Sequence, residues 1–203
     1  SSYGNIRIML PMVSNVSELI ETKKIIKEVK KDLLKKNKKL KFTVPKIGVL
    51  IETPAAALIS EALAKNCDFF AIGTNDLTMY TLAIDRGDEE VAKIYDPGHL
   101  SVLKLIRMAA KSAERNKIPV SICGEMAGDT LFTPILIGMG IRTLSMSTSR
   151  ILKVKQYLSQ VNSNEVKKIS DDIFKQNDNV VIKNILHNYN QEINKRIRET
   201  KNG

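Results

Sequence analysis

Cysteine is scarce in this chain, with two residues among 203, and tryptophan is absent. Two cysteines are too few for the disulfide framework of a small secreted protein, so Cys67 and Cys123 are expected to be free thiols. No apolar run in the sequence approaches the roughly 18 residues that span a bilayer, and the first residues lack a signal-peptide pattern. We therefore expect a cytoplasmic protein that does not insert into membranes.

Aromatic residues make up only 5% of the chain, and they form no aromatic platform of the kind that binds RNA. Zinc-finger spacing and a KH-type glycine clamp are also missing from the sequence. The net charge is nevertheless +10, with lysines concentrated in residues 23–41 and 153–201. Because these lysines alternate with apolar residues at helical spacing, they predict solvated helix faces that attract anionic substrates. We expect no nucleic-acid partner.

The order of apolar segments predicts an α/β fold. Strand-like runs without two-residue alternation, typical of strands buried on both faces, occur at residues 6–10, 46–51, 69–73, 119–123 and 143–146. Helical patterns lie between them at residues 16–34, 54–65, 100–115 and 131–138. This repetition predicts a parallel sheet, either doubly wound or closed into a barrel. Because a (β/α)8 barrel needs eight strands and about 250 residues, five strands indicate an open sheet or the later part of a TIM-type barrel.

The composition changes after residue 158. Residues 159–203 are rich in asparagine and lysine and contain no further strand pattern. Apolar residues such as Ile173 and Ile193 predict two additional helices, with a frayed tail after Arg198. We therefore predict a partial barrel domain over residues 1–158 and a C-terminal helical appendage over residues 159–203. The two edge strands of the sheet are expected to be covered by this tail or by another chain.

Polar residues follow the predicted strands at the points where they end. Glu52 follows one strand, Asn75 and Asp76 follow the next, and Cys123 ends a third. In parallel α/β folds these carboxyl ends meet at one edge, where ligands bind. Two carboxylates completed by substrate oxygens and water form a typical Mg²⁺ environment. Taken singly, Glu52 could instead complement a helix dipole and Asp76 could cap a helix; the shared edge favours a metal site.

Two further residues suggest anion binding and proton transfer. Arg86, in AIDRGD, carries a guanidinium suited to phosphate or carboxylate, although a surface ion pair with a neighbouring aspartate is the alternative. Cys123 precedes Gly124, which allows a ligand to approach the backbone closely. Nearby helix amides and a metal or arginine would lower the pKa of the Cys123 thiol into a range useful for proton transfer. The alternative, a buried apolar thiol, is the role we assign to Cys67.

Several longer motifs together resemble one known family. The segments IRIMLPMVS, IGVLIETPAAA, DFFAIGTNDLTMYTLAIDRG, YDP, SICGEMAGD, LIGMGI and LSMS occur in order at suitable spacing. They resemble the phosphoenolpyruvate (PEP)-binding barrel domain of Enzyme I, the PEP–protein phosphotransferase that starts the bacterial sugar phosphotransferase system. The resemblance covers residues 6–155. Pyruvate phosphate dikinase and PEP synthase share GTNDL and CGE, and their equivalent domain is an alternative, as is a dimerisation or regulatory module with a vestigial site.

The resemblance implies roles for individual residues. Glu52 and Asp76 match the Mg²⁺ ligands, Asn75, Asp76 and Arg86 match substrate-binding positions, and Cys123 matches the residue that protonates C3 as pyruvate forms. It also implies PEP and pyruvate as substrate and product, and a homodimer formed through this domain. A histidine-containing phosphocarrier protein is the implied partner, engaged through another region.

The sequence also departs from the family pattern. The phosphoryl-accepting histidine motif and the early barrel strands with their substrate-binding arginines do not occur in these 203 residues. Met79 stands where glutamine is common, and Leu152 where a proline often opens the last barrel helix. We therefore expect that the chain does not catalyse phosphoryl transfer by itself.

Overall fold

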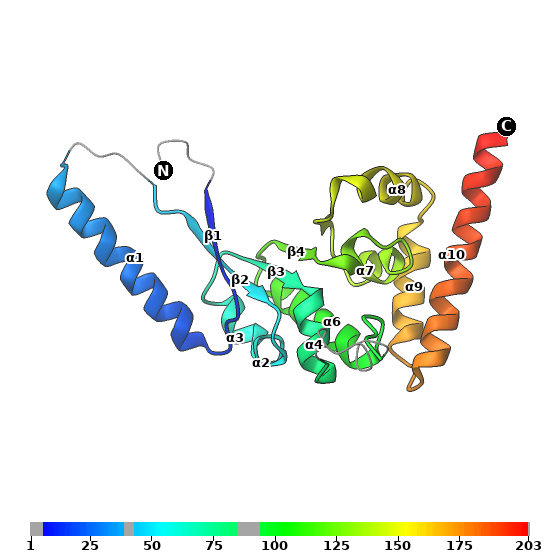
Figure 1. Ribbon diagram of the computed structural model, residues 1–203, viewed down its shortest axis with the longest axis horizontal. Coiled ribbons are helices and arrows are strands. Elements are labelled where there is room, and N and C mark those ends of the chain that lie inside the picture. Colours follow the sequence, from blue (N-terminus) through cyan, green and yellow to red (C-terminus); the bar gives the residue numbers. More distant parts are fainter. Residues whose placement is uncertain (1–5, 39–42, 85–93, 203) are drawn as a thin grey trace.

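Five parallel strands form one sheet in a computed structural model of the chain, in which residues 6–38, 43–84 and 94–202 are described (Figure 1). The strands are β1 (Arg7–Leu10), β2 (Lys46–Ile51), β3 (Phe69–Gly73), β4 (Val120–Cys123) and β5 (Thr143–Leu144). Their order in the sheet is their order in the chain. Strands that follow one another across the sheet in chain order are typical of part of a (β/α) barrel, whereas the strand order of a doubly wound sheet reverses at one point. The predicted α/β fold with five barrel-type strands is confirmed.

Helices and one 3-10 turn occupy most of the described connections. They are α1 (Val16–Lys36), α2 (Pro54–Leu58), α3 (Ser60–Ala64), α4 (Thr74–Leu82), α6 (Leu100–Arg115), η1 (Glu125–Gly128), α7 (Thr133–Gly138), α8 (Thr148–Leu158), α9 (Ser163–Ile173) and α10 (Asn179–Asn202). The single helix predicted over residues 54–65 is wrong, because the backbone of Ile59 leaves the helical conformation and separates α2 from α3. After this break, the buried Ser60 hydroxyl lies 3.0 Å from that of Ser112 on α6.

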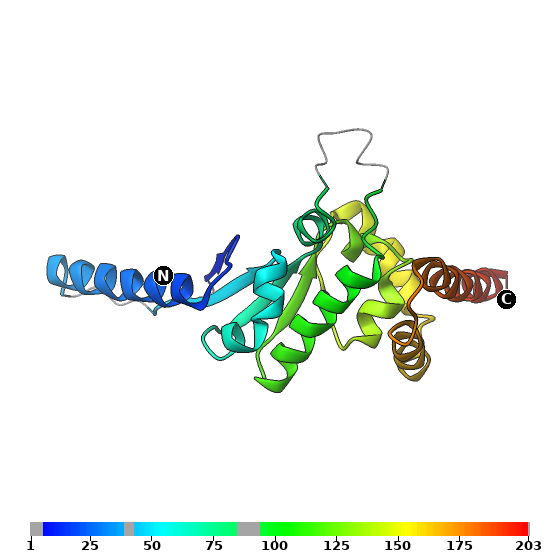
Figure 2. The ribbon, with the colours of Figure 1, turned by 90° about the horizontal axis from the view of Figure 1, so that it is seen from below.

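The two faces of the sheet carry different side chains. Ile47, Val49 and Ile51 of β2 lie in the main apolar core, together with Ile72 of β3 and Ile122 of β4. Helices α2, α3 and α6 cover this face, and Figure 2 shows α6 lying alongside the strands. Because side chains alternate along a strand, the residues between them point to the opposite face, which is the interior side of a barrel.

The C-terminal helices pack against α7 and α8, at one end of the molecule (Figure 1). Ile182 and Leu186 of α10 belong to the same core as the sheet, while Tyr157, Val166, Tyr189 and Ile193 form a second cluster. Among the described residues β1 and β5 each pair with a strand on one side only, and the covering of these edges by the tail or by another chain stays a prediction. The expected fraying after Arg198 is wrong, since α10 continues to Asn202.

Helix α7 approaches α9 most closely at Gly138. A Cβ added there would collide with the backbone carbonyl oxygen of Val166 and lie 2.7 Å from Cβ of Ser170. We predict that Gly138→Ala lowers the free energy of unfolding by about 3 kcal/mol, the upper end of overpacking costs, because a backbone atom cannot move aside easily. Gly140→Ala is the control: its φ of 90° is strained, but nothing lies within 4 Å, so about 1 kcal/mol is expected. Urea unfolding that gives Gly138→Ala no larger loss than Gly140→Ala would contradict the prediction.

Helix α1 extends away from the rest of the chain (Figures 1 and 2). Its one fully buried side chain among those described is Leu19, whereas Ile20, Ile25, Val29 and Leu33 are exposed. An apolar stripe of this kind packs against a neighbouring helix in a complete barrel. Of the helices in the described ranges, none is both long and apolar enough to cross a bilayer.

Candidate functional site

The carboxyl ends of β2 to β5 place a row of site residues side by side. Gly73 pairs with Cys123, and Glu52 comes one residue after the pair Ile51–Ile72, which sets it beside Gly73. Since Gly73 has no side chain, the Glu52 carboxylate lies over it: a Cβ there would be 3.0 Å from Oε2 of Glu52. Glu52, Gly73 and Cys123 therefore lie side by side at the carboxyl edge of the sheet, where the sequence predicts that the strand ends meet.

The Glu52 carboxylate is buried, with 4% of the residue exposed. Its Oε1 accepts a hydrogen bond of 2.7 Å from the backbone N–H of Met12, a residue held at a left-handed φ of 53°. Burial raises the pKa of Glu52, the Met12 N–H opposes this, and the charge of Asp76 and a side-chain hydrogen bond with Asp76 raise it further. Asp76 thus disfavours the ionisation of Glu52, and two neighbouring carboxyl groups of this kind are a donor set that a divalent cation would stabilise.

The start of α4 is tied to the end of β4 by two side chains. The hydroxyl of Thr74 donates to the carbonyl oxygen of Cys123 at 2.9 Å, and Oδ1 of Asn75 accepts from the backbone N–H of Glu125 at 3.0 Å. Asp76 follows in the first turn of α4, whose N-terminal flanking residue is Gly73, so Asp76 is not the cap itself. Because Oδ1 of Asn75 is engaged, its amide N–H groups are the part that could bind an anionic ligand.

Cys123 is half-buried, and its thiol donates to the carbonyl oxygen of Ile72 with an Sγ–O distance of 3.4 Å. Burial raises the pKa of this thiol, and the charges of Glu52 and Asp76 raise it further. Burial and the two carboxylates therefore act against the expected lowering of this pKa, and the lowering that a bound metal or an arginine would cause stays a prediction. The raised pKa favours the protonated thiol, which is the form that can donate a proton.

Cys123 opens onto a cavity of about 710 Å³ at the same edge of the sheet. The cavity is lined by Asn75, Cys123, Gly124, Glu125, Gly128, Asp129, Ser145, Met146, Ser147 and Arg150. Glu52 and Asp76 are not in this lining, although both lie close enough to the thiol for their charges to raise its pKa. Arg86 lies outside the described residues, and its predicted role stays a prediction.

The connection between β4 and η1, which lies next to Thr74 and Asn75, requires glycine at position 124. The φ of 96° and ψ of −177° at Gly124 suit glycine almost alone. A Cβ there would also collide with Oγ1 of Thr74 and lie 2.8 Å from Oδ1 of Asn75.

We therefore predict that Gly124→Ala lowers the free energy of unfolding by about 3 kcal/mol and weakens ligand binding by displacing Asn75. Urea unfolding and ligand titration measure the two effects. Wild-type stability together with wild-type binding would contradict this role for Gly124.

Two contributors to the site were not singled out from the sequence. Met12 acts through its backbone N–H and its left-handed φ, and a methionine gives no sequence signal for either. Arg150 lines the cavity from the first turn of α8. Its position depends on how α8 follows the short strand β5, which the sequence pattern did not resolve.

Comparison with known proteins identifies the family of this chain. Residues 1–163 match the family described as "PEP-utilising enzyme, PEP-binding domain". The chain is similar to the PEP-protein phosphotransferase of Mycoplasma genitalium, with 35% identity over 93% of this chain and 32% of that protein. The protein of the same name from Bacillus subtilis is 39% identical over 85% of this chain and 30% of its own length. The chain thus spans about a third of the length of these relatives. It belongs to the PEP-utilising enzymes, and it carries their PEP-binding domain.

Proposed function

We propose that this chain is the PEP-binding part of a PEP–protein phosphotransferase. In this function it holds PEP while the phosphoryl group passes to a histidine, and it then protonates the remaining enolate to give pyruvate. The observation that carries the proposal is the row of strand ends, where the Glu52 and Asp76 carboxylates flank the Cys123 thiol. The similar proteins of Mycoplasma genitalium and Bacillus subtilis are PEP-protein phosphotransferases by name, which favours this activity over that of a dikinase or a PEP synthase.

Mg²⁺ is the proposed cofactor, bound by Glu52 and Asp76. Among the described residues, no three His, Cys, Asp or Glu side chains come together as a metal site. Two carboxylates are nevertheless a sufficient protein contribution for Mg²⁺, which usually keeps several waters and binds substrate oxygens. When bound, the ion would supply positive charge to offset the phosphate and enolate oxygens.

The proposed chemistry divides between phosphoryl transfer and proton transfer. The bond between the phosphorus and the C2 oxygen breaks as the histidine nitrogen bonds to phosphorus, which leaves pyruvate enolate. Asn75 and Arg86 would bind the phosphoryl oxygens through N–H groups. The enolate then forms its C2 carbonyl as C3 takes the proton from Sγ of Cys123, and the thiolate regains a proton from solvent. In reverse, the thiolate removes a methyl proton from pyruvate.

The accepting histidine is proposed to lie outside residues 1–203. His99 precedes α6, and its Nδ1 accepts a hydrogen bond of 3.2 Å from the backbone N–H of Ser101, while His187 lies on α10. Neither belongs to the cavity beside Cys123. A histidine-containing phosphocarrier protein is the proposed next acceptor. A homodimer formed through this domain and a cytoplasmic location, consistent with two free cysteines, complete the proposal.

Pyruvate release tests this function directly. The complete protein that carries this chain should release pyruvate from PEP in step with phosphorylation of a histidine-containing phosphocarrier protein, and only when Mg²⁺ is present. Residues 1–203 alone should release none. Failure of the complete protein to phosphorylate the carrier would refute the function. Release by residues 1–203 as sole enzyme would refute the proposed division of groups between regions.

A further inference from the structure

Arg150 is a cation placed at the cavity beside Cys123. It lies in the first turn of α8, which follows β5 directly. The other charged residues in the described lining of the cavity, Glu125 and Asp129, are acidic. Arg150 is thus the positive group that the described lining offers to an anionic ligand.

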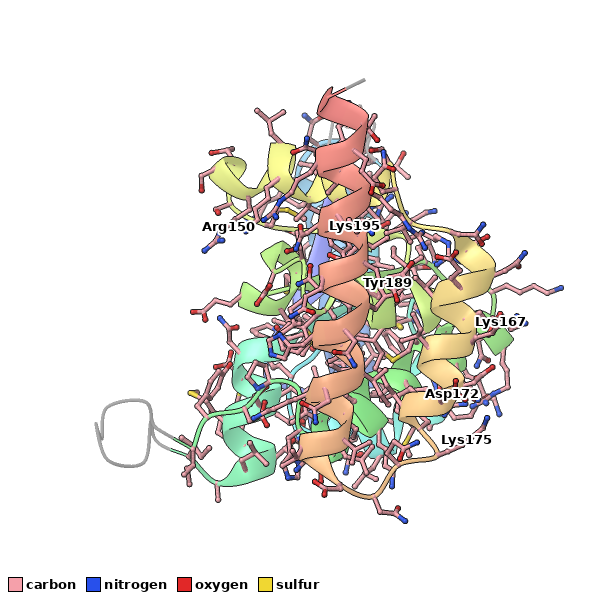
Figure 3. All side chains as sticks on the ribbon, turned by 90° about the vertical axis from the view of Figure 1, so that its right-hand side faces the viewer. Arg150, Lys167, Asp172, Lys175, Tyr189 and Lys195 are labelled. Carbon is pink, nitrogen blue, oxygen red and sulfur yellow. The ribbon has the colours of Figure 1, made fainter. Side chains whose placement is uncertain are left out.

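The stability of the fold does not account for this arginine. Its guanidinium makes no hydrogen bond or ion pair with any other described residue, and the residue is exposed. Figure 3 shows its side chain extending away from α10 and out from the body of the molecule. A cation in the first turn of a helix also faces the positive end of the helix dipole, which is unfavourable. Its position therefore suggests a role toward a ligand.

The stem of Arg150 is held in place next to the cysteine segment. A Cβ on Gly128 would lie 3.2 Å from Cγ of Arg150 and 3.3 Å from its Cβ, so the stem packs over the end of η1. The turn η1 begins two residues after Cys123. This packing fixes the base of the side chain at the cavity and leaves the guanidinium free to meet a ligand there.

We propose that Arg150 is a substrate-binding residue that pairs with a carboxylate or phosphoryl group of the enolpyruvate ligand. The inference rests on the proposed function and deepens it. Arg150 lines the cavity onto which Cys123 opens, whereas Glu52 and Asp76 lie near the thiol outside that lining, so Arg150 would give the ligand a contact that the two carboxylates do not. A guanidinium suits both anions because each can accept two parallel hydrogen bonds. Arg150 would therefore select charged three-carbon acids over neutral analogues.

Calorimetric titration of the complete protein with PEP, pyruvate and inorganic phosphate, each with Mg²⁺, tests this assignment. Arg150→Gln should weaken PEP binding about 10- to 100-fold, the effect of losing a charge-assisted hydrogen bond. Arg150→Lys should recover part of the loss, since it restores the charge without the fork of donors. Lys153→Gln is the matched control, because Lys153 is an exposed cation on the same helix outside the cavity lining, and it should bind PEP as wild type does.

The three ligands identify the group that Arg150 contacts. Weaker binding of PEP and pyruvate assigns the carboxylate, and weaker binding of PEP and phosphate assigns the phosphoryl group. Wild-type PEP affinity in Arg150→Gln overturns the Arg150 assignment alone, whereas a wild-type protein that binds no PEP overturns the proposed function as well. The melting temperature of Arg150→Gln should match that of the wild type, and a clear drop together with no rescue by lysine would indicate a structural role instead.

Discussion

Replacing Cys123 with alanine is expected to lower the rate of pyruvate formation by about 10² to 10⁴, the usual contribution of a positioned acid. The thiol is half-buried at the cavity, and burial together with the charges of Glu52 and Asp76 raises its pKa. Both effects favour the protonated thiol that the proposed proton transfer requires. PEP binding should change little, because alanine removes no charge and leaves the carboxylates and Asn75 in place.

Two measurements separate this role from a structural one. In D₂O, pyruvate formed by the wild type should carry deuterium at C3 from the enzyme thiol, and the rate of its appearance by NMR should fall in Cys123→Ala. The control is Cys67→Ala: Cys67 is buried in the core, its pKa is raised to about 11, and its thiol contacts the carbonyl oxygen of Phe69. Cys67→Ala should keep the wild-type rate. A wild-type rate in Cys123→Ala would remove the cysteine from the mechanism.

Replacing Glu52 with glutamine is expected to weaken Mg²⁺-dependent PEP binding by at least about 100-fold, because loss of even an outer-shell partner of a metal ligand costs 10- to 100-fold. Stability of the metal-free protein should not fall with it. Glu52 is buried beside Asp76, and its raised pKa shows that its charged form is disfavoured there. Removing the charge relieves that repulsion while the amide oxygen can still accept from the N–H of Met12.

Glu52→Gln is therefore expected to weaken PEP binding without lowering the stability of the metal-free protein. Urea unfolding without Mg²⁺ should give Glu52→Gln a stability equal to or above that of the wild type, while calorimetry with Mg²⁺ and PEP shows the loss of binding. Glu61→Gln is the control, since Glu61 is a partly exposed acid on α3, on the helical side of the sheet, and pairs with Arg115 at 2.7 Å. It should leave binding unchanged. A Glu52→Gln protein that unfolds more easily and still binds PEP would mean that Glu52 is structural.

The fold could be predicted in segments whose sequence pattern suits only one kind of secondary structure. The strands at residues 46–51 and 69–73 have the predicted bounds, because continuous apolar runs between turns suit strands buried on both faces. The break at Ile59 was not predictable, since it depends on how Ser60 meets Ser112 on α6. The domain boundary at residue 158 stays a prediction.

The candidate site was partly predictable for a similar reason. Glu52 and Asp76 follow two adjacent parallel strands, and Cys123 ends the next one. Parallel strands bring their carboxyl ends to one edge. The direction of the shift in the Cys123 pKa could not be predicted from the sequence, because it depends on burial and on which charges face the thiol. The hydrogen bond that Glu52 accepts from Met12 could not be predicted either, since its donor is a backbone N–H rather than a side chain.

In the proposed function, the carboxyl ends of β2, β3 and β4 form a metal-dependent PEP site. Calorimetric titration of the complete protein with PEP, with Mg²⁺ and then with EDTA, measures this dependence. We expect binding in Mg²⁺ that is lost in EDTA and lost likewise in Glu52→Gln and Asp76→Asn. PEP binding of equal affinity with and without Mg²⁺, unchanged in both variants, would mean that this edge of the sheet is not a metal-dependent PEP site.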